Sequence, residues 1–196
     1  MEISRPSKIK FDKKCEFVTI LTIIKTKENL IMEKKISARR KAILNVCYGA
    51  VIAALYVVLT WISAIFKLDS GIVQFRISEA LCILGVFTPA AIPGMTVGCL
   101  LSNLIFSGNA YDMLFGSLAT LIGMLGVYLL RKLPYVAPLP YVLSNAIIVP
   151  FVLQYAYGVP DAFWFLMLTV GAGEIACAYA GGVALYFALK RTRAFK

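Results

Sequence analysis

The sequence predicts an all-α fold, an integral membrane bundle of six transmembrane helices with both termini in the cytoplasm. Three observations lead to this prediction. Of 196 residues, 60% are hydrophobic and only 15% are charged, whereas soluble domains are about a quarter charged. From Ile43 onward, apolar stretches follow one another with only brief polar or Pro/Gly interruptions. The basic residues are grouped at the ends of these stretches.

Each predicted span is an apolar stretch bounded by charge, glycine or proline. A helix needs about 20 mostly apolar residues to cross a bilayer. The segment 67–75 (KLDSGIVQF) reads as a loop, and TPAAIPG at 88–94 breaks the following apolar region into a hairpin of two helices. The six spans are predicted at 43–66, 77–87, 90–106, 111–130, 138–155 and 162–189.

Charge distribution supports six spans over five. With the N-terminus inside, the basic groups at 39–41, 131–132 and 190–193 all lie in the cytoplasm, and only Lys67 and Arg76 lie outside. A single crossing by residues 77–106 would place the groups at 131–132 and 190–193 outside, against the positive-inside rule.

The net charge of +10 is concentrated at the N-terminus. Residues 1–41 hold 12 basic residues and 5 acidic ones, a net of +7, in a chain otherwise apolar. We therefore interpret 1–41 as a basic cytoplasmic tail and not as a nucleic-acid surface, 42–190 as the membrane domain, and 191–196 as a second basic tail. Residues 1–31 are polar and irregular in pattern, and Met32 is an alternative start to Met1.

Catalytic and metal chemistry have little support. The chain has no histidine, which excludes Ser-His-Asp and Cys-His catalysis and imidazole ligands. Its five cysteines show no CxxC spacing and read as small buried apolar residues. No GxxxxGK[ST] motif for ATP is present. We expect a protein that is not an enzyme and holds no metal or cofactor of its own.

Charged residues within the spans are the candidate binding groups, because charge at membrane depth is costly unless it is paired or hydrated. Glu174 lies near the middle of the last span. Arg76 and Glu79 lie three apart at the outer end of the second span, either as a rim ion pair or as pocket residues. Asp112 opens the fourth span, where it reads as a helix-start acid or a second pocket carboxylate.

Amides and aromatic residues extend this candidate pocket. Asn103 and Asn145 lie in apolar helices, where they bond either a neighbouring helix or a ligand. Phe75, Tyr111 and Trp164 lie near the outer boundary, as an aromatic belt or as stacking surfaces for a flat ring. The residues alone predict an outward-facing pocket for a small polar solute.

Several phrases together resemble one known family. They are QFRISEAL (74–81), TPAAIPG (88–94), GCLLSN (98–103), YDMLFGSLATL (111–121), APLPYVLSNAIIVP (137–150) and GAGEIACAY (171–179). In this combination, the region 41–190 resembles the QueT-type queuosine-precursor transporters, which are substrate-binding S components of energy-coupling factor (ECF) transporters. Residues 1–31 match nothing in that pattern.

The resemblance implies a specific ligand and specific partners. The ligand would be a 7-deazaguanine, such as the aminomethyl or cyano precursor, or queuine. The partners would be a transmembrane coupling subunit and two ATPases, so ATP would be used outside this chain. Ala50 and Ala54 match the small-residue face that docks the coupling subunit in such proteins.

The same resemblance carries a set of pocket residues over to this chain, namely Arg76, Glu79, Asn103, Asp112, Asn145 and Glu174. Glu79 or Glu174 would accept from the ring N–H and amino groups, Asp112 would face a cationic arm, and Arg76 or an asparagine would donate to the 6-oxo group. The loop 67–75 would be a lid. Two alternatives stay open: a stand-alone proton-coupled carrier using Glu174 or Glu79, or an S component for a different vitamin.

Overall fold

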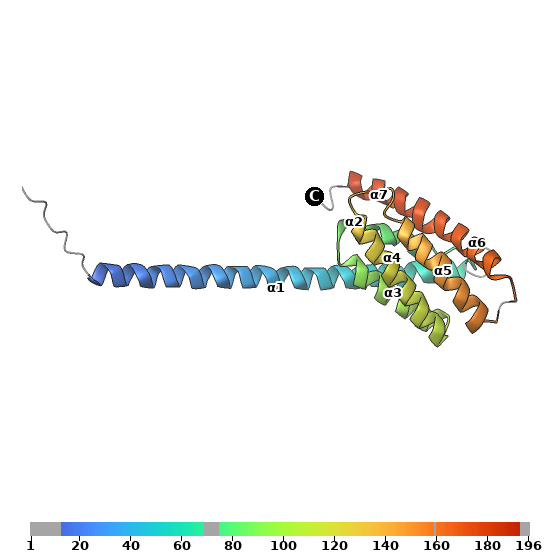
Figure 1. Cartoon of the computed structure of the whole chain (residues 1–196), viewed down its shortest axis with the longest axis horizontal. Helices are drawn as coiled ribbons and strands as arrows, with labels where there is room; N and C mark the ends of the chain where they lie inside the picture. The colour runs from blue at the N-terminus through green and yellow to red at the C-terminus, as the bar shows by residue number, and fades with distance from the viewer. Residues whose placement is uncertain (1–12, 69–74, 159, 193–196) are drawn as a thin grey trace, which may run out of the picture. The chain divides into compact units, whose positions relative to one another are not determined.

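The all-α prediction is confirmed by a computed structural model of the chain. The structure describes residues 13–68, 75–158 and 160–192, and for residues 13–31 and 33 it describes the backbone alone. Every regular element in these ranges is helical, and Figure 1 shows how the elements follow one another. Asp69 and most of the predicted lid loop 67–75 lie outside the described residues.

The first helix, α1 (Lys13–Ile65), begins much earlier than the first predicted span. Residues 13–31 therefore continue a helix in spite of their irregular pattern. Only the part Lys34–Ile65 is both long and apolar enough to cross a membrane. The chain divides into two compact units, residues 1–44 and residues 45–196, and the second unit holds the features described below.

The predicted hairpin at 77–106 is present, with its break at residues 88–90. Its first arm is a 3₁₀ helix, η1 (Ile77–Ile83), followed by one turn of α-helix, α2 (Leu84–Phe87). The 3₁₀ helix rises more per residue than an α-helix, so the 11 residues Ile77–Phe87 cover roughly 20 Å. The second arm is α3 (Ala91–Phe106).

The remaining helices also follow the predicted spans. They are η2 (Asp112–Gly116) with α4 (Ser117–Leu129), α5 (Leu139–Ala156), and α6 (Phe163–Glu174) with η3 (Ile175–Gly181) and α7 (Gly182–Arg191). These three segments and α1 have the length and hydropathy of membrane spans, while the two arms of the hairpin are shorter.

The helices of the second unit pack mainly against their neighbours in sequence, α3 on α4, α4 on α5 and α5 on α6. The exception is η1, which packs against η3 and α7 and also touches α3 and α4. A buried cluster that includes Met95, Met124, Cys82 and Tyr141 fills the space between them. Most large apolar side chains outside this cluster are exposed, as expected for helices that face lipid.

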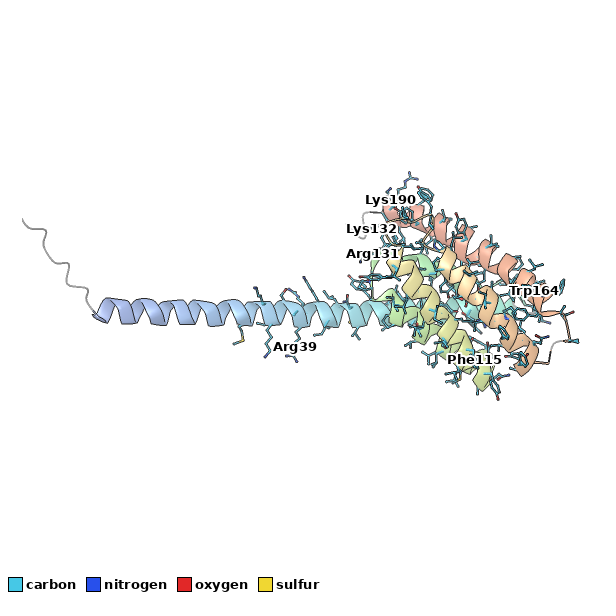
Figure 2. The ribbon with its side chains drawn as sticks, viewed as in Figure 1. Arg39, Phe115, Arg131, Lys132, Trp164 and Lys190 are labelled. Atoms are coloured by element: carbon cyan, nitrogen blue, oxygen red, sulfur yellow. The ribbon has the colours of Figure 1, made fainter. Side chains whose placement is uncertain are left out.

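Two of the basic groups lie together at one end of the second unit. Arg131 and Lys132, after α4, lie near Lys190 in α7, whereas Trp164 lies toward the other end (Figure 2). Ring contacts of Tyr135 with Tyr186 and Phe187 join the two segments there. This common end agrees with the prediction that both groups face the same side of the membrane. That this side is the cytoplasm stays a prediction.

Candidate binding cavity

A cavity of about 520 Å³ lies between the helices of the second unit. This volume falls within the range of roughly 300–1,000 Å³ that is usual for small-molecule sites. Its wall includes the end of α3 (Phe106 and Ser107), the start of η2 (Asp112) and Tyr157 just after α5. Because Asp112 and Arg131 are at opposite ends of the η2–α4 segment, the cavity lies toward the end away from the basic groups.

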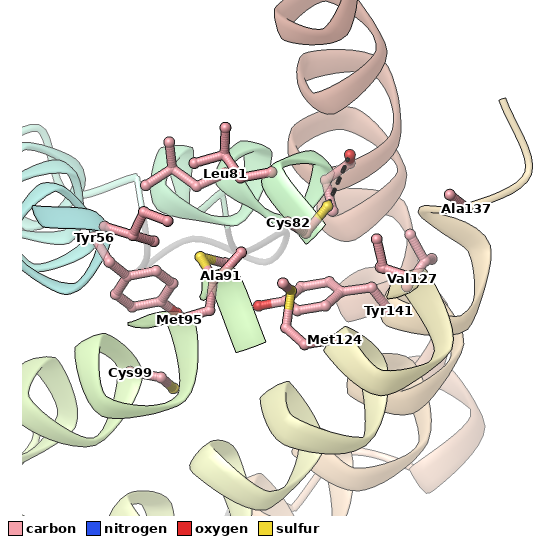
Figure 3. Close-up of a cluster of buried hydrophobic side chains, with 14 residues drawn as sticks. Tyr56, Leu81, Cys82, Ala91, Met95, Cys99, Met124, Val127, Ala137 and Tyr141 are labelled. Carbon is pink, nitrogen blue, oxygen red and sulfur yellow. Dashed lines mark hydrogen bonds between the residues drawn. The ribbon is translucent and has the colours of Figure 1, made fainter. Parts of the chain in front are cut away.

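Glu79 in η1 lines the cavity, and both its carboxylate oxygens are already hydrogen-bonded. The Tyr56 hydroxyl of α1 donates to Oε1 at 2.7 Å, and the Tyr141 hydroxyl of α5 donates to Oε2. The carboxylate is 3% exposed, and both tyrosines are fully buried. Figure 3 shows the two hydroxyls turned toward each other from opposite sides of the core. The three side chains thus join α1, η1 and α5.

Glycines bring these helices close enough for the tyrosines to reach Glu79. A Cβ atom on Gly98 of α3 would lie 2.8 Å from Cβ of Tyr56, and one on Gly123 of α4 would lie 2.8 Å from Cα of Tyr141. Only glycine permits such close approach of helix backbones. Helix α5 can therefore pack directly on α4, and α1 on α3, with each tyrosine held at the contact.

The beginning of η1 is also fixed by hydroxyl groups of α1. Thr60 donates to the Ser78 hydroxyl at 2.9 Å, and the Ser63 hydroxyl accepts from the backbone N–H of Ile77 at 3.0 Å. These bonds satisfy a helix start that has no capping side chain of its own. They hold Arg76 and Glu79 at the cavity wall.

Arg76 bonds an asparagine and not the neighbouring glutamate. Its Nη2 donates to Oδ1 of Asn103 at 3.1 Å, and Nδ2 of Asn103 donates to the backbone carbonyl of Asp112 at 3.0 Å. Asn103 is 1% exposed and stands behind the cavity wall. Among the described side chains, the direct hydrogen bond of the Arg76 guanidinium goes to Asn103, and the direct hydrogen bonds of Glu79 come from the two tyrosines.

Asp112 stands at the mouth of the cavity, half-buried, opposite Tyr157. The Tyr157 hydroxyl donates to Oδ2 of Asp112 at 3.4 Å, which is a long and exposed contact. Partial burial, followed by the nearby charge of Asp112, raises the pKa of the Tyr157 phenol. The phenol therefore keeps its proton at neutral pH and acts as the donor.

Glu174 at the end of α6 and Asn145 in α5 also line the cavity. Both are buried, with exposed fractions of 8% and 4%. Asn145 interacts electrostatically with Glu174, yet neither Oε2 of Glu174 nor Nδ2 of Asn145 has a hydrogen bond of acceptable geometry. Glu174 and Asn145 are thus buried polar residues of the wall that each leave one atom without a hydrogen bond.

The two cavity acids outside η1, Asp112 and Glu174, are next to wide helical turns. Asp112 begins the π-helix η2, and Glu174 immediately precedes the π-helix η3. Such turns are rare and occur frequently at functional sites. The extra residue per turn alters which side chains face inward, and hydrophobic periodicity in the sequence does not reveal it.

The aromatic residues of the predicted site do not line the cavity. Phe75 and Tyr111 are 37% and 62% exposed, and Trp164 is 69% exposed. Exposure at the end of the bundle is typical of an aromatic belt at the membrane boundary and does not favour stacking on a ligand.

Sequence analysis missed the two tyrosines that hold Glu79. A tyrosine in a membrane helix is usually interpreted as an interfacial residue, and Tyr141 lies near a span end. The position of Tyr56 was the available signal, since it is near the middle of the first predicted span, where its hydroxyl needs a partner.

The small residues of α1 divide into two faces. Gly49 and Ala53 are buried against α3, where a Cβ atom on Gly94 would lie only 2.7 Å from the Gly49 carbonyl oxygen. Ala50 and Ala54 are exposed, and Ala50 borders an apolar groove between α1 and the start of α3. The predicted docking residues are therefore on a face that no helix of the described bundle covers.

The fold and the site together define a multi-pass helical membrane protein with a polar cavity between its helices. The family comparison then gives its place among known proteins. Residues 46–191 match the QueT transporter family model, and this range contains every residue of the cavity wall. The chain belongs to the QueT transporter family.

One curated relative is the queuosine precursor transporter QueT of Lactococcus lactis subsp. cremoris (strain MG1363). It is 40% identical over 84 residues, which cover 42% of this chain and 49% of the relative. The match thus spans about half the length of the curated relative. No solved structure matches this chain.

Proposed function

We propose that this chain is the substrate-binding membrane subunit of an ATP-driven importer for a queuosine precursor. The ligand would be a 7-deazaguanine in its aminomethyl or cyano form, or queuine. The observation that carries the proposal is the family match over residues 46–191, which includes the whole cavity wall. The bacterial relative, a queuosine precursor transporter, supports this ligand class.

The character of the cavity supports a planar polar ligand. Its wall combines carboxylates, an arginine and an amide with apolar side chains such as Val149, Val152 and Val170. Small-molecule sites are usually mainly apolar, with a few polar groups that set the orientation of the ligand. A flat heterocycle can contact the apolar side chains with its faces and the polar groups with its edges.

The proposed partners are a transmembrane coupling subunit and two ATPases of an ECF module in a bacterial cytoplasmic membrane. We assign the docking of the coupling subunit to Ala50 and Ala54, whose exposure on α1 supports this role. Small residues let another helix approach the backbone closely in lipid. ATP would be bound and hydrolysed by the partners.

Thermal stability of the purified protein tests the ligand. The panel would contain the aminomethyl and cyano deazaguanines, queuine, guanine, riboflavin, thiamin and biotin. A ligand that binds only the folded state stabilises it by about 2.7 kcal/mol at a hundred times Kd. We expect stabilisation by a deazaguanine alone. Stabilisation by another vitamin would overturn the substrate and keep the architecture.

Uptake into proteoliposomes tests the energy source. We expect uptake only when the coupling subunit and ATPases are reconstituted with this chain and ATP is supplied. Uptake that persists without these partners and stops when the proton gradient is dissipated would contradict the proposal. That result would favour a proton-coupled carrier, for which the buried Glu174 is the suitable relay group.

A further inference from the structure

The polar groups of the cavity wall differ in whether their hydrogen bonds are already made. Glu79 accepts from Tyr56 and Tyr141 on both oxygens. Arg76 donates to Asn103, whose own nitrogen is bonded to the Asp112 carbonyl. A ligand that used Glu79 would share oxygens that each already accept one buried hydrogen bond.

Glu174 and Asn145 are in the opposite situation. Each is more than nine-tenths buried, each lines the cavity, and each has a polar atom with no hydrogen bond. A buried polar atom without a partner lowers stability, because it loses its hydrogen bonds to water and gains none in the protein. Such atoms are uncommon in folded proteins and call for an explanation.

Helix packing alone does not provide this explanation. Asn145 and Glu174 lie close enough to interact, but Nδ2 of Asn145 makes no hydrogen bond of good geometry to the Glu174 carboxylate, so the contact between α5 and α6 leaves both groups incompletely satisfied. The hydroxyls of Ser102 and Ser117 are also unpaired, but neither residue belongs to the cavity wall. Glu174 and Asn145 differ from those serines because they line the cavity, so a ligand that draws the two side chains toward it can bond the atoms that are covered in the structure.

We infer that Asn145 and Glu174 together bind one edge of the ligand ring, as a donor next to an acceptor. Nδ2 of Asn145 donates to a ring carbonyl oxygen, and Oε2 of Glu174 accepts from the adjacent ring N–H. The complementary ligand is a lactam-containing heterocycle, and in a 7-deazaguanine the 6-oxo group and N1–H form this edge. Glu79 is a positioning residue that holds the cavity wall without touching the ligand. This inference rests on the proposed function and specifies how the cavity recognises its ligand.

A ligand pair tests this assignment, with the aminomethyl deazaguanine as parent and its N1-methyl derivative as the altered edge. Methylation removes the N–H and covers the lactam edge. Affinities would be measured by isothermal titration calorimetry on monodisperse detergent-solubilised protein. We expect the wild-type protein to bind the methylated compound at least about tenfold more weakly, because a hydrogen bond to a charged group is lost.

Variants then locate the groups responsible. In Glu174→Gln, we expect the methylation penalty, which is the loss of affinity caused by N1-methylation, to shrink at least about threefold, because the charged acceptor of the ring N–H becomes neutral. In Asn145→Ala, which removes the donor to the ring carbonyl oxygen, we expect the parent compound itself to bind at least about threefold more weakly. In Glu79→Gln, the penalty should remain that of the wild-type protein, whatever the variant does to stability. The two variants of the pair also provide independent tests if one of them fails to fold.

The results separate this inference from the proposed function. Failure of the wild-type protein to bind any deazaguanine would overturn both. An unchanged methylation penalty in Glu174→Gln, or an unchanged affinity for the parent compound in Asn145→Ala, would overturn the inference and leave the function intact. A penalty that disappears in Glu79→Gln instead would assign the lactam edge to Glu79.

Discussion

Helix α3 passes from a very close helix contact to the edge of the open cavity. Near its start, Gly94 and Gly98 face α1 with no room for a Cβ atom, since the nearest atoms would lie at 2.7 and 2.8 Å. Toward its end, Phe106 and Ser107 border a cavity of about 520 Å³. Small residues near the start of α3 therefore allow direct contact with α1, whereas larger and polar residues near its end border the open cavity.

The largest effect is expected where a side chain is added at the close contact. Gly94→Ala would place a methyl group against the Gly49 carbonyl and Cα of α1, and these backbone atoms cannot rotate away. We expect a loss of about 2–3 kcal/mol in the free energy of unfolding, the usual scale of overpacking. Reversible unfolding of the detergent-solubilised protein would measure it.

Gly171→Ala is the matched control for this substitution. A methyl group there would lie 3.6 Å from Cβ of Ala146, an ordinary contact, and alanine favours the helix over glycine by about 0.5–1 kcal/mol. The control variant should be as stable as the wild-type protein or slightly more stable. Equal destabilisation of both variants would mean that the contact between α1 and α3 is not tighter than the rest of the bundle.

A smaller effect is expected where the packed region meets the cavity. Tyr141 packs on Gly123 at one side and donates to Glu79 at the other. Tyr141→Phe keeps the ring and removes the donor, so one buried carboxylate oxygen loses its partner. We expect a loss of about 1–2 kcal/mol in unfolding free energy.

Tyr56→Phe, which removes the donor to the other oxygen, should cost a similar amount. If the double variant lost much less than the sum of the two single variants, the tyrosines would act through Glu79 as one unit. No loss of stability in either single variant would show that Glu79 does not depend on these hydroxyls.

The smallest effect on stability is expected where a side chain is enlarged into the open space. Val149 lines the cavity, so Val149→Phe has room that Gly94→Ala lacks. We expect unfolding free energy to change by no more than about 0.5 kcal/mol. The added ring would occupy the ligand's space, so stabilisation by the deazaguanine should be lost. Ligand stabilisation equal to that of the wild-type protein would place the binding site elsewhere.

Hydropathy and charge were sufficient to predict the spans, because the membrane imposes a length and a polarity on each helix. The prolines and glycine of TPAAIPG (88–94) predicted the hairpin break, which the structure confines to residues 88–90 because α3 begins at Ala91. The four-residue spacing of Gly94 and Gly98 is one that lets helix backbones approach closely in lipid. It did not show that their partners are Gly49, Ala53 and Tyr56, since a spacing of four residues gives a helix face but not the helix that covers it.

The candidate site was less accessible to sequence reasoning. Glu174 stood out because a carboxylate near mid-membrane is costly, and the structure places it at the cavity wall. The sequence did not distinguish Glu79, with its two tyrosine donors, from Glu174, which has an unpaired oxygen. That difference depends on partners 23 and 62 residues away and on wide turns that periodicity does not reveal.

The bridge of Tyr56, Glu79 and Tyr141 has a consequence for the empty protein. It connects α1, η1 and α5 through buried hydrogen bonds that need no ligand, so one wall of the cavity is preorganised. Preorganisation reduces the conformational entropy that a binding partner must overcome. The entropy lost on binding would then come mainly from the ligand and from the groups that contact it, and the empty protein would present this wall to every new ligand in the same form.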